Sequence, residues 1–358
     1  MPSRRHFLAG LAASAGLATT GTWAAAGAPD FLSAARFPDG SYQLAGLTRT
    51  GEILFTLPLP DRGHAAAAHP RRAEAVAFAR RPGDFALVID CITGQDRARL
   101  TAPQGRHFYG HGVFTHDGAR LYTTENDYEA GEGVIGVWDA QTLARLGEFP
   151  SGGVGPHDMV LLPDGQTLVV ANGGIETHPS SGRAKLNIPV MEPNLSYLSL
   201  DGTLIERMEL DRELHKNSIR HLAVGADGTV AFAMQWQGGD EVVPLLGLHA
   251  KDNAPSLLTP PADQLRRMNG YAGSVALSGD GKQVAITSPR GGLMQIHDLT
   301  TGALLAMPEQ PDVCGIGTLA DGFLFTTGEG VVGHADGDTV TELAHHDCQF
   351  DNHLVRLT

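Results

Sequence analysis

The fold is decided by the stretch VLLPDGQTLVVA at residues 160–171. Two short apolar runs flank the turn Pro163-Asp164-Gly165, a pattern typical of two antiparallel strands joined by a tight turn. The turn recurs as HDG, ADG, GDG and ADG at 116–118, 226–228, 279–281 and 320–322, with a degenerate copy at 69–71. Successive turns are 47, 47, 63, 53 and 41 residues apart. This period indicates propeller blades, each made of four antiparallel strands.

Six such copies lie between residues 63 and about 344, and the two ends of the chain supply a seventh. Residues 31–37, 41–47 and 52–57 resemble three strands that lack an inner partner, and residues 353–357 resemble that missing inner strand. Closing the ring with strands from both termini removes an exposed sheet edge. The sequence therefore predicts an all-β fold, a seven-bladed β-propeller of the WD40/YVTN type. The 45 glycines and 21 prolines among 358 residues suit many short strands and turns.

The N-terminus has the pattern of an export signal. Ser3-Arg4-Arg5-His6-Phe7-Leu8 resembles the twin-arginine consensus, and a run of small residues at 24–28 follows a modestly apolar stretch. We expect residues 1–28 to be a twin-arginine signal and residues 29–358 to form a single propeller domain, exported folded to the periplasm. No later apolar run approaches the roughly 20 residues of a membrane span, so we expect no membrane insertion after signal removal.

The charge balance limits the classes of partner. Twenty-six basic residues stand against 40 acidic ones, for a net charge of −14, and no basic run follows the first few residues. Nucleic-acid binding needs a clustered basic surface, so a nucleic-acid partner is not expected.

Histidine is unusually frequent, with sixteen residues. Alignment of the inner strands on the recurring turn puts a histidine at, or one place from, the same position in five blades: His64, His111, His157, His221 and His353. The starts of the inner strands converge on one mouth of the central channel, which predicts a ring of imidazoles. Two interpretations remain open at this point. Each histidine either bonds within its own blade and holds it together, or the ring binds a metal ion.

Neutral imidazole is the commonest protein ligand for first-row transition metals, and iron or copper is the expected ion, with zinc less favoured. Asp158, next to His157, would be a ligand or an acceptor that fixes a histidine tautomer. The absence of a CxxCH motif excludes covalent c-type haem, whereas non-covalent haem held between two histidines stays open.

Loops on the same face add polar groups. An insertion at about 175–194 lengthens one blade, carries Glu176 and His178, and is expected to act as a lid over the mouth. Arg290 and Glu329 lie in other loops of this face, where a charge would orient an anionic ligand. His107 is expected to line the same mouth.

An enzyme is the alternative to a metal-binding protein, although it is the less favoured one. A lactonase-like hydrolase would use a histidine with Asp158 or Glu329 as general base and Arg290 as the oxyanion donor. A metal-dependent oxidase and a protein-interaction scaffold without metal also stay open, because propellers host all of these functions.

The twin-arginine start and the seven-blade period, together with GPHD at 155–158, NGGIETHP at 172–179, KLN at 185–187 and MEPNL at 191–195, resemble one uncharacterised bacterial family of exported propellers of about 360 residues. The resemblance covers nearly the whole chain. Members are often encoded beside imelysin-type iron-uptake proteins and a di-haem oxidoreductase-like protein. The resemblance thus implies a role in periplasmic iron or copper handling, with other uptake proteins as partners, and carries no established activity.

Overall fold

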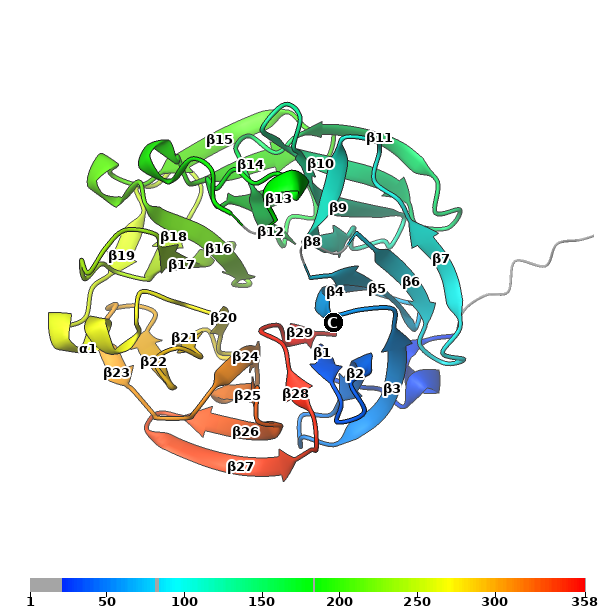
Figure 1. Ribbon diagram of the computed structural model, residues 1–358. Coiled ribbons are helices and arrows are strands. Elements are labelled where there is room, and N and C mark those ends of the chain that lie inside the picture. Colours follow the sequence, from blue (N-terminus) through cyan, green and yellow to red (C-terminus); the bar gives the residue numbers. More distant parts are fainter. Residues whose placement is uncertain (1–20, 81–83, 183, 358) are drawn as a thin grey trace, which may run out of the picture.

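The computed structural model describes residues 21–80, 84–182 and 184–357. In these residues the strands form seven sheets, which are arranged as blades around a central channel (Figure 1). This confirms the predicted seven-bladed propeller. Strands follow one another from the channel outward in six of the sheets, so each blade is a four-stranded antiparallel meander.

The first three of these meanders follow one another in sequence. Their strands are β4 (Gly63–Ala68), β5 (Glu74–Ala79), β6 (Ala86–Asp90) and β7 (Asp96–Leu100); β8 (Arg106–Phe114), β9 (Arg120–Asp127), β10 (Glu132–Asp139) and β11 (Arg145–Pro150); and β12 (Pro156–Leu161), β13 (Thr167–Asn172), β14 (Asn194–Ser199) and β15 (Leu204–Glu209).

The other three meanders complete most of the ring. Their strands are β16 (Asn217–Val224), β17 (Val230–Trp236), β18 (Leu246–His249) and β19 (Ser256–Leu258); β20 (Ser274–Leu277), β21 (Gln283–Ser288), β22 (Leu293–Asp298) and β23 (Leu304–Ala306); and β24 (Val313–Thr318), β25 (Phe323–Thr327), β26 (Val331–Asp336) and β27 (Thr339–His345). A short helix, α1 (Ala262–Arg267), precedes β20.

Both ends of the chain build the seventh blade, as predicted. Strands β1 (Phe31–Arg36), β2 (Tyr42–Leu47) and β3 (Ile53–Leu59) are joined at the channel side by β28 (Gln349–Phe350) and β29 (Val355–Arg356). One detail of the prediction is wrong: the inner strand is split in two, and His353 lies between its halves rather than at the start of a continuous strand. The Ser33 hydroxyl donates a hydrogen bond to the carbonyl of His353 at 2.9 Å and holds this segment against β1.

Apolar side chains fill the interfaces between neighbouring blades. The described residues contain seven buried hydrophobic clusters, and each joins two adjacent sheets. The hydrophobic core of the propeller therefore lies between the blades.

The predicted export signal is described only at its end. Residues 1–20, with the paired arginines, lie outside the described residues. A 3-10 helix at Trp23–Ala26 packs on the propeller, where Trp23 Nε1 donates to the carbonyl of His69 at 2.8 Å. Of the helices in the described part of the chain, none has both the length and the apolar character that a membrane crossing requires.

Candidate metal centre

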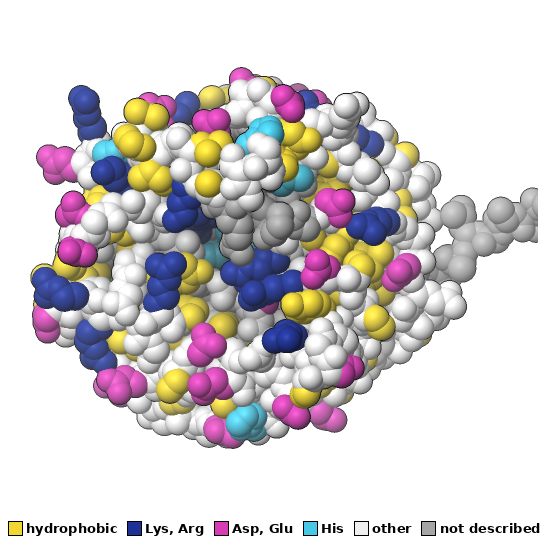
Figure 2. Space-filling view, in the orientation of Figure 1, with side chains coloured by type: hydrophobic (Ala, Val, Ile, Leu, Met, Phe, Trp, Pro, Cys, Tyr) yellow, Lys and Arg dark blue, Asp and Glu magenta, His cyan; other side chains and the backbone are white. Residues whose placement is uncertain are grey.

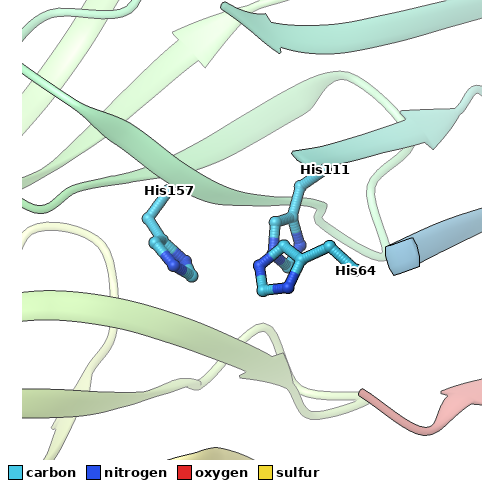
Figure 3. A group of neighbouring side chains, drawn as sticks. All are labelled: His64, His111 and His157. Carbon is cyan, nitrogen blue, oxygen red and sulfur yellow. The ribbon is translucent and has the colours of Figure 1, made fainter. Parts of the chain in front are cut away.

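The five predicted histidines meet at the channel axis. His64, His111, His157 and His221 come from the inner strands β4, β8, β12 and β16, and His353 comes from the segment between β28 and β29. Eight pairs of their rings have centroids 4.4–6.4 Å apart. All five side chains are buried, with 3–9% of their surface exposed. We call these five residues the central histidines; Figure 3 shows three of them converging from separate segments.

Irregular pairing turns these side chains toward the axis. In β12 the pairing passes from Pro156 directly to Asp158, which leaves His157 as an extra, bulged residue. In β16 it passes from Ile219 to His221, so Arg220 is the extra residue there. Bulges re-aim side chains next to functional sites. By register Asp158 is thus the counterpart of His221, which explains why His157 stands one place from the predicted position.

A glycine makes room where β4 and β8 approach each other. Gly110 adopts a φ of +109°, a backbone conformation that residues other than glycine rarely adopt. A Cβ atom at this position would lie 2.6 Å from Cδ2 of His64. The irregular part of β8 between Phe108 and Gly112 therefore brings His111 and His64 together only because residue 110 has no side chain.

The imidazole hydrogen bonds of His111 and His157 run to the neighbouring blades. His111 Nδ1 lies 2.9 Å from Asp158 of the next blade, and Asp158 also accepts from the backbone N–H of Leu222 in the blade beyond, at 3.0 Å. His157 Nδ1 lies 3.0 Å from the carbonyl of Arg220. Only a protonated Nδ1 can donate to a carbonyl, so this bond leaves Nε2 of His157 with its lone pair. For His111 and His157, these contacts contradict the interpretation in which each histidine bonds inside its own blade.

Several ring nitrogens have no hydrogen-bond partner among the described residues. In the cluster they are Nδ1 of His64, Nε2 of His111, Nε2 of His353 and both ring nitrogens of His221; outside it, Nε2 of the buried His297 also lacks a partner. A buried polar atom without a partner costs about 1–3 kcal/mol, so it needs an explanation other than stability. A metal ion bound between these nitrogens would accept their lone pairs and so supply the missing partner.

Two overlapping sets of three nitrogens have metal-like spacing. His64, His111 and His157 form one set, and His111, His221 and His353 form the other, with ligand atoms within 4.8 Å of one another in each. Three such atoms lie within 4.8 Å divided by √3, or about 2.8 Å, of a common point. Metal–imidazole bonds are about 2.0–2.1 Å long for zinc, so modest side-chain movement would close either set around an ion. His111 belongs to both.

Burial keeps four of the five central imidazoles neutral. It lowers the pKa of His64 to about 4, and it lowers the pKa of His157 and His353 well below the ordinary value. The pKa of His221 is also well below its ordinary value, again mainly through burial. Burial acts in the opposite sense on Asp158, but the adjacent His111 and the N–H of Leu222 hold the pKa of that carboxyl below its usual range. Neutral imidazole is the form that binds metal.

Asp351, which the sequence analysis did not single out, anchors the closing segment beside the cluster. Its carboxylate accepts from Arg62 at 2.8 Å and from Arg80 at 2.8 Å, and it lies 3.6 Å from Nδ1 of His64. The last distance is an electrostatic contact and is too long for a good hydrogen bond. The only sequence signal for this role is its position, two residues before His353.

The cluster divides the channel into two cavities. A cavity of about 220 Å³ on one side includes His64, His157 and His221 in its lining. A cavity of about 450 Å³ on the other side includes His111, His221 and His353, and its remaining lining is largely aliphatic. His221 faces both cavities.

Comparison with known proteins places the chain in a family. A family model matches residues 57–357, from within β3 to just after β29. The chain belongs to the DUF1513 family. This family is described as proteins of unknown function, and no curated protein matches the sequence. A hydrazine synthase chain of Kuenenia stuttgartiensis is similar in fold, with a TM-score of 0.60 and 16% identity over 87% of this chain and 94% of that one.

The other predicted site residues of this DUF1513 protein are spread around the mouth. Arg290 lines the 220 Å³ cavity, whereas Glu329 is exposed and does not line it. His107 stacks on Tyr128, with 5.8 Å between ring centroids, and takes no part in the central ring contacts. His178 bonds to the hydroxyl of Ser180 at 2.6 Å.

The insertion after β13 carries two short 3-10 helices, Pro179–Ser181 and Ile188–Val190. The carbonyl of Ile175 accepts from the Tyr109 hydroxyl at 3.2 Å, which fixes its start to β8. The insertion reaches the mouth through Lys185, whereas Glu176 lies beside Gly131.

Proposed function

We propose that this protein binds one first-row transition metal ion through the central histidines, in the uptake or handling of that metal. The observation that carries the proposal is a set of five buried imidazoles from five blades with partnerless nitrogens that face one another. The two blades without a central histidine have Ser274 and Gly315 near the corresponding position, so the propeller does not require imidazole there.

Copper or iron is the proposed ion. An all-imidazole donor set suits copper, iron, nickel and zinc, and the usual affinity order places Cu²⁺ above the other divalent ions of the first row. Iron rests on the resemblance to exported propellers encoded beside iron-uptake proteins, and zinc is less favoured. Haem is disfavoured because the rings contact one another directly, with centroids as close as 4.4 Å, and leave no gap for a macrocycle.

The proposed place of action is the periplasm, after export of the folded chain by the twin-arginine route, beside partner proteins of the same uptake system. Folding before export would let the channel close around its ion first. Metal uptake and release, rather than catalysis, is the proposed role, since Asp158 is already engaged by His111 and by a backbone N–H.

Metal content and metal affinity test the proposal together. Protein recovered after native export is analysed for metals, and metal-free protein is then titrated with Cu²⁺, Fe²⁺ and Zn²⁺ by equilibrium dialysis. We expect about one ion per chain. Because His111 belongs to both sets, His111→Ala should lose binding by at least about 100-fold. His64→Ala and His221→Ala each disrupt one set, so their comparison assigns the ion.

His345→Ala is the matched control, because this imidazole is 59% exposed and lies outside the cluster. It should bind metal like the wild type. Thermal melts of all variants check folding. The proposal is wrong if the folded wild type binds none of the three ions, or if the folded His111→Ala variant binds as tightly as the wild type.

A further inference from the structure

The cavity on the loop side of the central histidines is strongly cationic. Arg80, Lys185, Arg220 and Arg290 line it, and no carboxylate stands among its lining residues in the described part of the chain. Figure 2 shows Lys and Arg side chains gathered around this central hollow. Four cations around one cavity contrast with the net charge of −14 for the chain as a whole.

These four cations come from four different blades. Arg80 follows β5, Lys185 belongs to the insertion between β13 and β14, Arg220 is the bulged residue of β16, and Arg290 follows β21. Residues so far apart in sequence meet only through the ring. The ring thus brings the four cations together at the mouth of the channel, as it brings the imidazoles together at the floor of the cavity.

Neighbouring groups hold two of the cations in place. The guanidinium of Arg290 stacks on Tyr271 at 4.4 Å, and the hydroxyl of Tyr271 accepts from Asn352 Nδ2 at 3.2 Å. Arg80 pairs with Asp351, but that single carboxylate also serves Arg62. The one buried carboxylate beside Arg80 is therefore shared between two guanidinium groups. Lys185 donates to the side-chain oxygen of Gln237.

The floor of this cavity is the candidate metal site itself. His64, His157 and His221 line it, and His221 is 3% exposed with both ring nitrogens lacking a partner among the described residues. A ligand in the cavity would thus touch guanidinium and ammonium groups above and imidazoles, or an ion bound to them, below.

We propose that this cavity binds a small oxyanion bearing carboxylate or phosphate groups, next to the metal site. Arginine suits both groups because its planar fork donates two parallel hydrogen bonds. The space against the histidines, about 220 Å³, has the size of a short dicarboxylate or inorganic phosphate. A neighbouring cavity of about 410 Å³ shares Arg80 and Arg290 but is also lined by Asp312 and Asp351, so the anion is placed against the histidines. The anion site stands on the cationic lining alone. Its coupling to a metal, in which the anion occupies the ion's open position, rests on the proposed function.

Calorimetric titration of metal-free protein tests the anion site first. Oxalate, citrate and phosphate are the probes, at constant ionic strength. We expect at least one to bind, and we expect Arg290→Gln and Lys185→Gln to weaken it about tenfold each. Both side chains are exposed, so the variants should fold. Lys282→Gln, which removes an exposed charge from the turn between β20 and β21, is the control and should not change the affinity. The affinities for oxalate and citrate, compared with the affinity for phosphate, show whether the natural ligand bears carboxylate or phosphate groups.

The same titrations on copper-loaded protein test the coupling. Dialysis after each titration confirms that the ion has stayed bound. We expect the anion to bind at least about fivefold more tightly to the loaded protein, and by linkage the ion to bind more tightly in the presence of anion by the same factor. Equal anion affinity with and without bound copper would overturn the coupling.

The two proposals fail separately. If metal binds but none of the three anions binds to either form, the oxyanion site is wrong and the metal site stands. If an anion binds and depends on Arg290 and Lys185 while no metal binds, the proposed function is wrong and the oxyanion site stands. Weakening by Lys282→Gln as large as that by Arg290→Gln would mean general charge attraction and would also overturn the site.

Discussion

Two groups of buried histidines in this protein are equally shielded from solvent but differ in their hydrogen bonds. His69 and His249 are each 2% exposed, and every ring nitrogen of both has a partner. His69 accepts from the N–H of Arg72 at 2.9 Å and contacts the carbonyl of Gly118, while His249 bonds to Tyr197 at 2.7 Å and to the carbonyl of Asn253 at 2.8 Å. The central histidines are as buried, yet His221 has no partner at either nitrogen.

A gathering of partnerless ring nitrogens therefore marks a site, whereas a single one does not: His297 is fully buried outside the cluster and also has one partnerless nitrogen. A buried imidazole with both nitrogens bonded contributes to stability, whereas one with free lone pairs reduces it. Burial or frequency of histidine alone would not distinguish the groups. Substitutions should therefore have opposite consequences in the two regions.

The largest effect on stability is expected at His249. His249→Leu removes both of its bonds and leaves the buried Tyr197 hydroxyl without its partner, which should lower the free energy of unfolding by about 3 kcal/mol. Metal binding should be unchanged. Urea denaturation and equilibrium dialysis measure the two quantities. Tyr197→Phe in the same variant should recover part of the loss, because it removes the stranded hydroxyl. A loss of metal affinity in folded His249→Leu would contradict the separation of the groups.

The next effect concerns the acceptor that orients His111. Asp158→Asn keeps the size of the side chain but removes its charge, and it should weaken metal binding by about 10–100-fold. Competition with a chelator of known affinity measures the change. Asp84→Asn, at a carboxylate that is 81% exposed, is the control and should bind as the wild type does. Unchanged affinity in Asp158→Asn would mean that Asp158 supports only the contact between blades.

Acid should destabilise the metal-free protein through His64. Burial lowers its pKa to about 4 in the native state, while the unfolded chain keeps a pKa near 6.5. As the pH falls below 6.5, the unfolded state gains a proton that the native state does not. Stability from this group is complete above about pH 6.5 and is lost down to about pH 4, at about 1.4 kcal/mol per pH unit, or about 2 kcal/mol by pH 5. Urea midpoints at pH 7, 6 and 5 measure the slope, and His64→Gln should reduce it by about one proton. If His64→Gln has the same slope as the wild type, His64 takes up a proton in the native state as well.

The fold was largely predictable because its signal repeats. The turn at 163–165 recurs at blade spacing, and a missing inner strand at one end of the chain matches a spare one at the other. The pairing irregularities were not predictable, since a bulge changes no residue type and is set by the neighbouring strand. They decide whether His157 or Asp158 faces the axis.

The imidazole ring was predictable by counting from each turn, but its surroundings were not. Arg220 directly precedes His221, and Asp351 stands two residues before His353, so both are close in sequence to predicted ligands. The place of Arg220 in the cavity depends on the neighbouring blade, and the contacts of Asp351 depend on the segment between β28 and β29. His107 and His178 had the same residue type as the ring but lie where aromatic and hydroxyl neighbours engage them.

The smallest effect is the most discriminating one, and it is expected at His221. His221→Leu replaces a buried ring that has two partnerless nitrogens with an apolar side chain of similar size, so metal-free protein should gain about 1 kcal/mol of stability and melt at a slightly higher temperature. The same change in a fold-serving histidine, His69→Leu, should lower the melting temperature because it strands the N–H groups of Arg71 and Arg72. Excess copper should then raise the melting temperature of the wild type more than that of His221→Leu, because binding to the native state adds stability only where the ligands remain. If His221→Leu melts well below the wild type without metal, the central histidines belong to the fold after all.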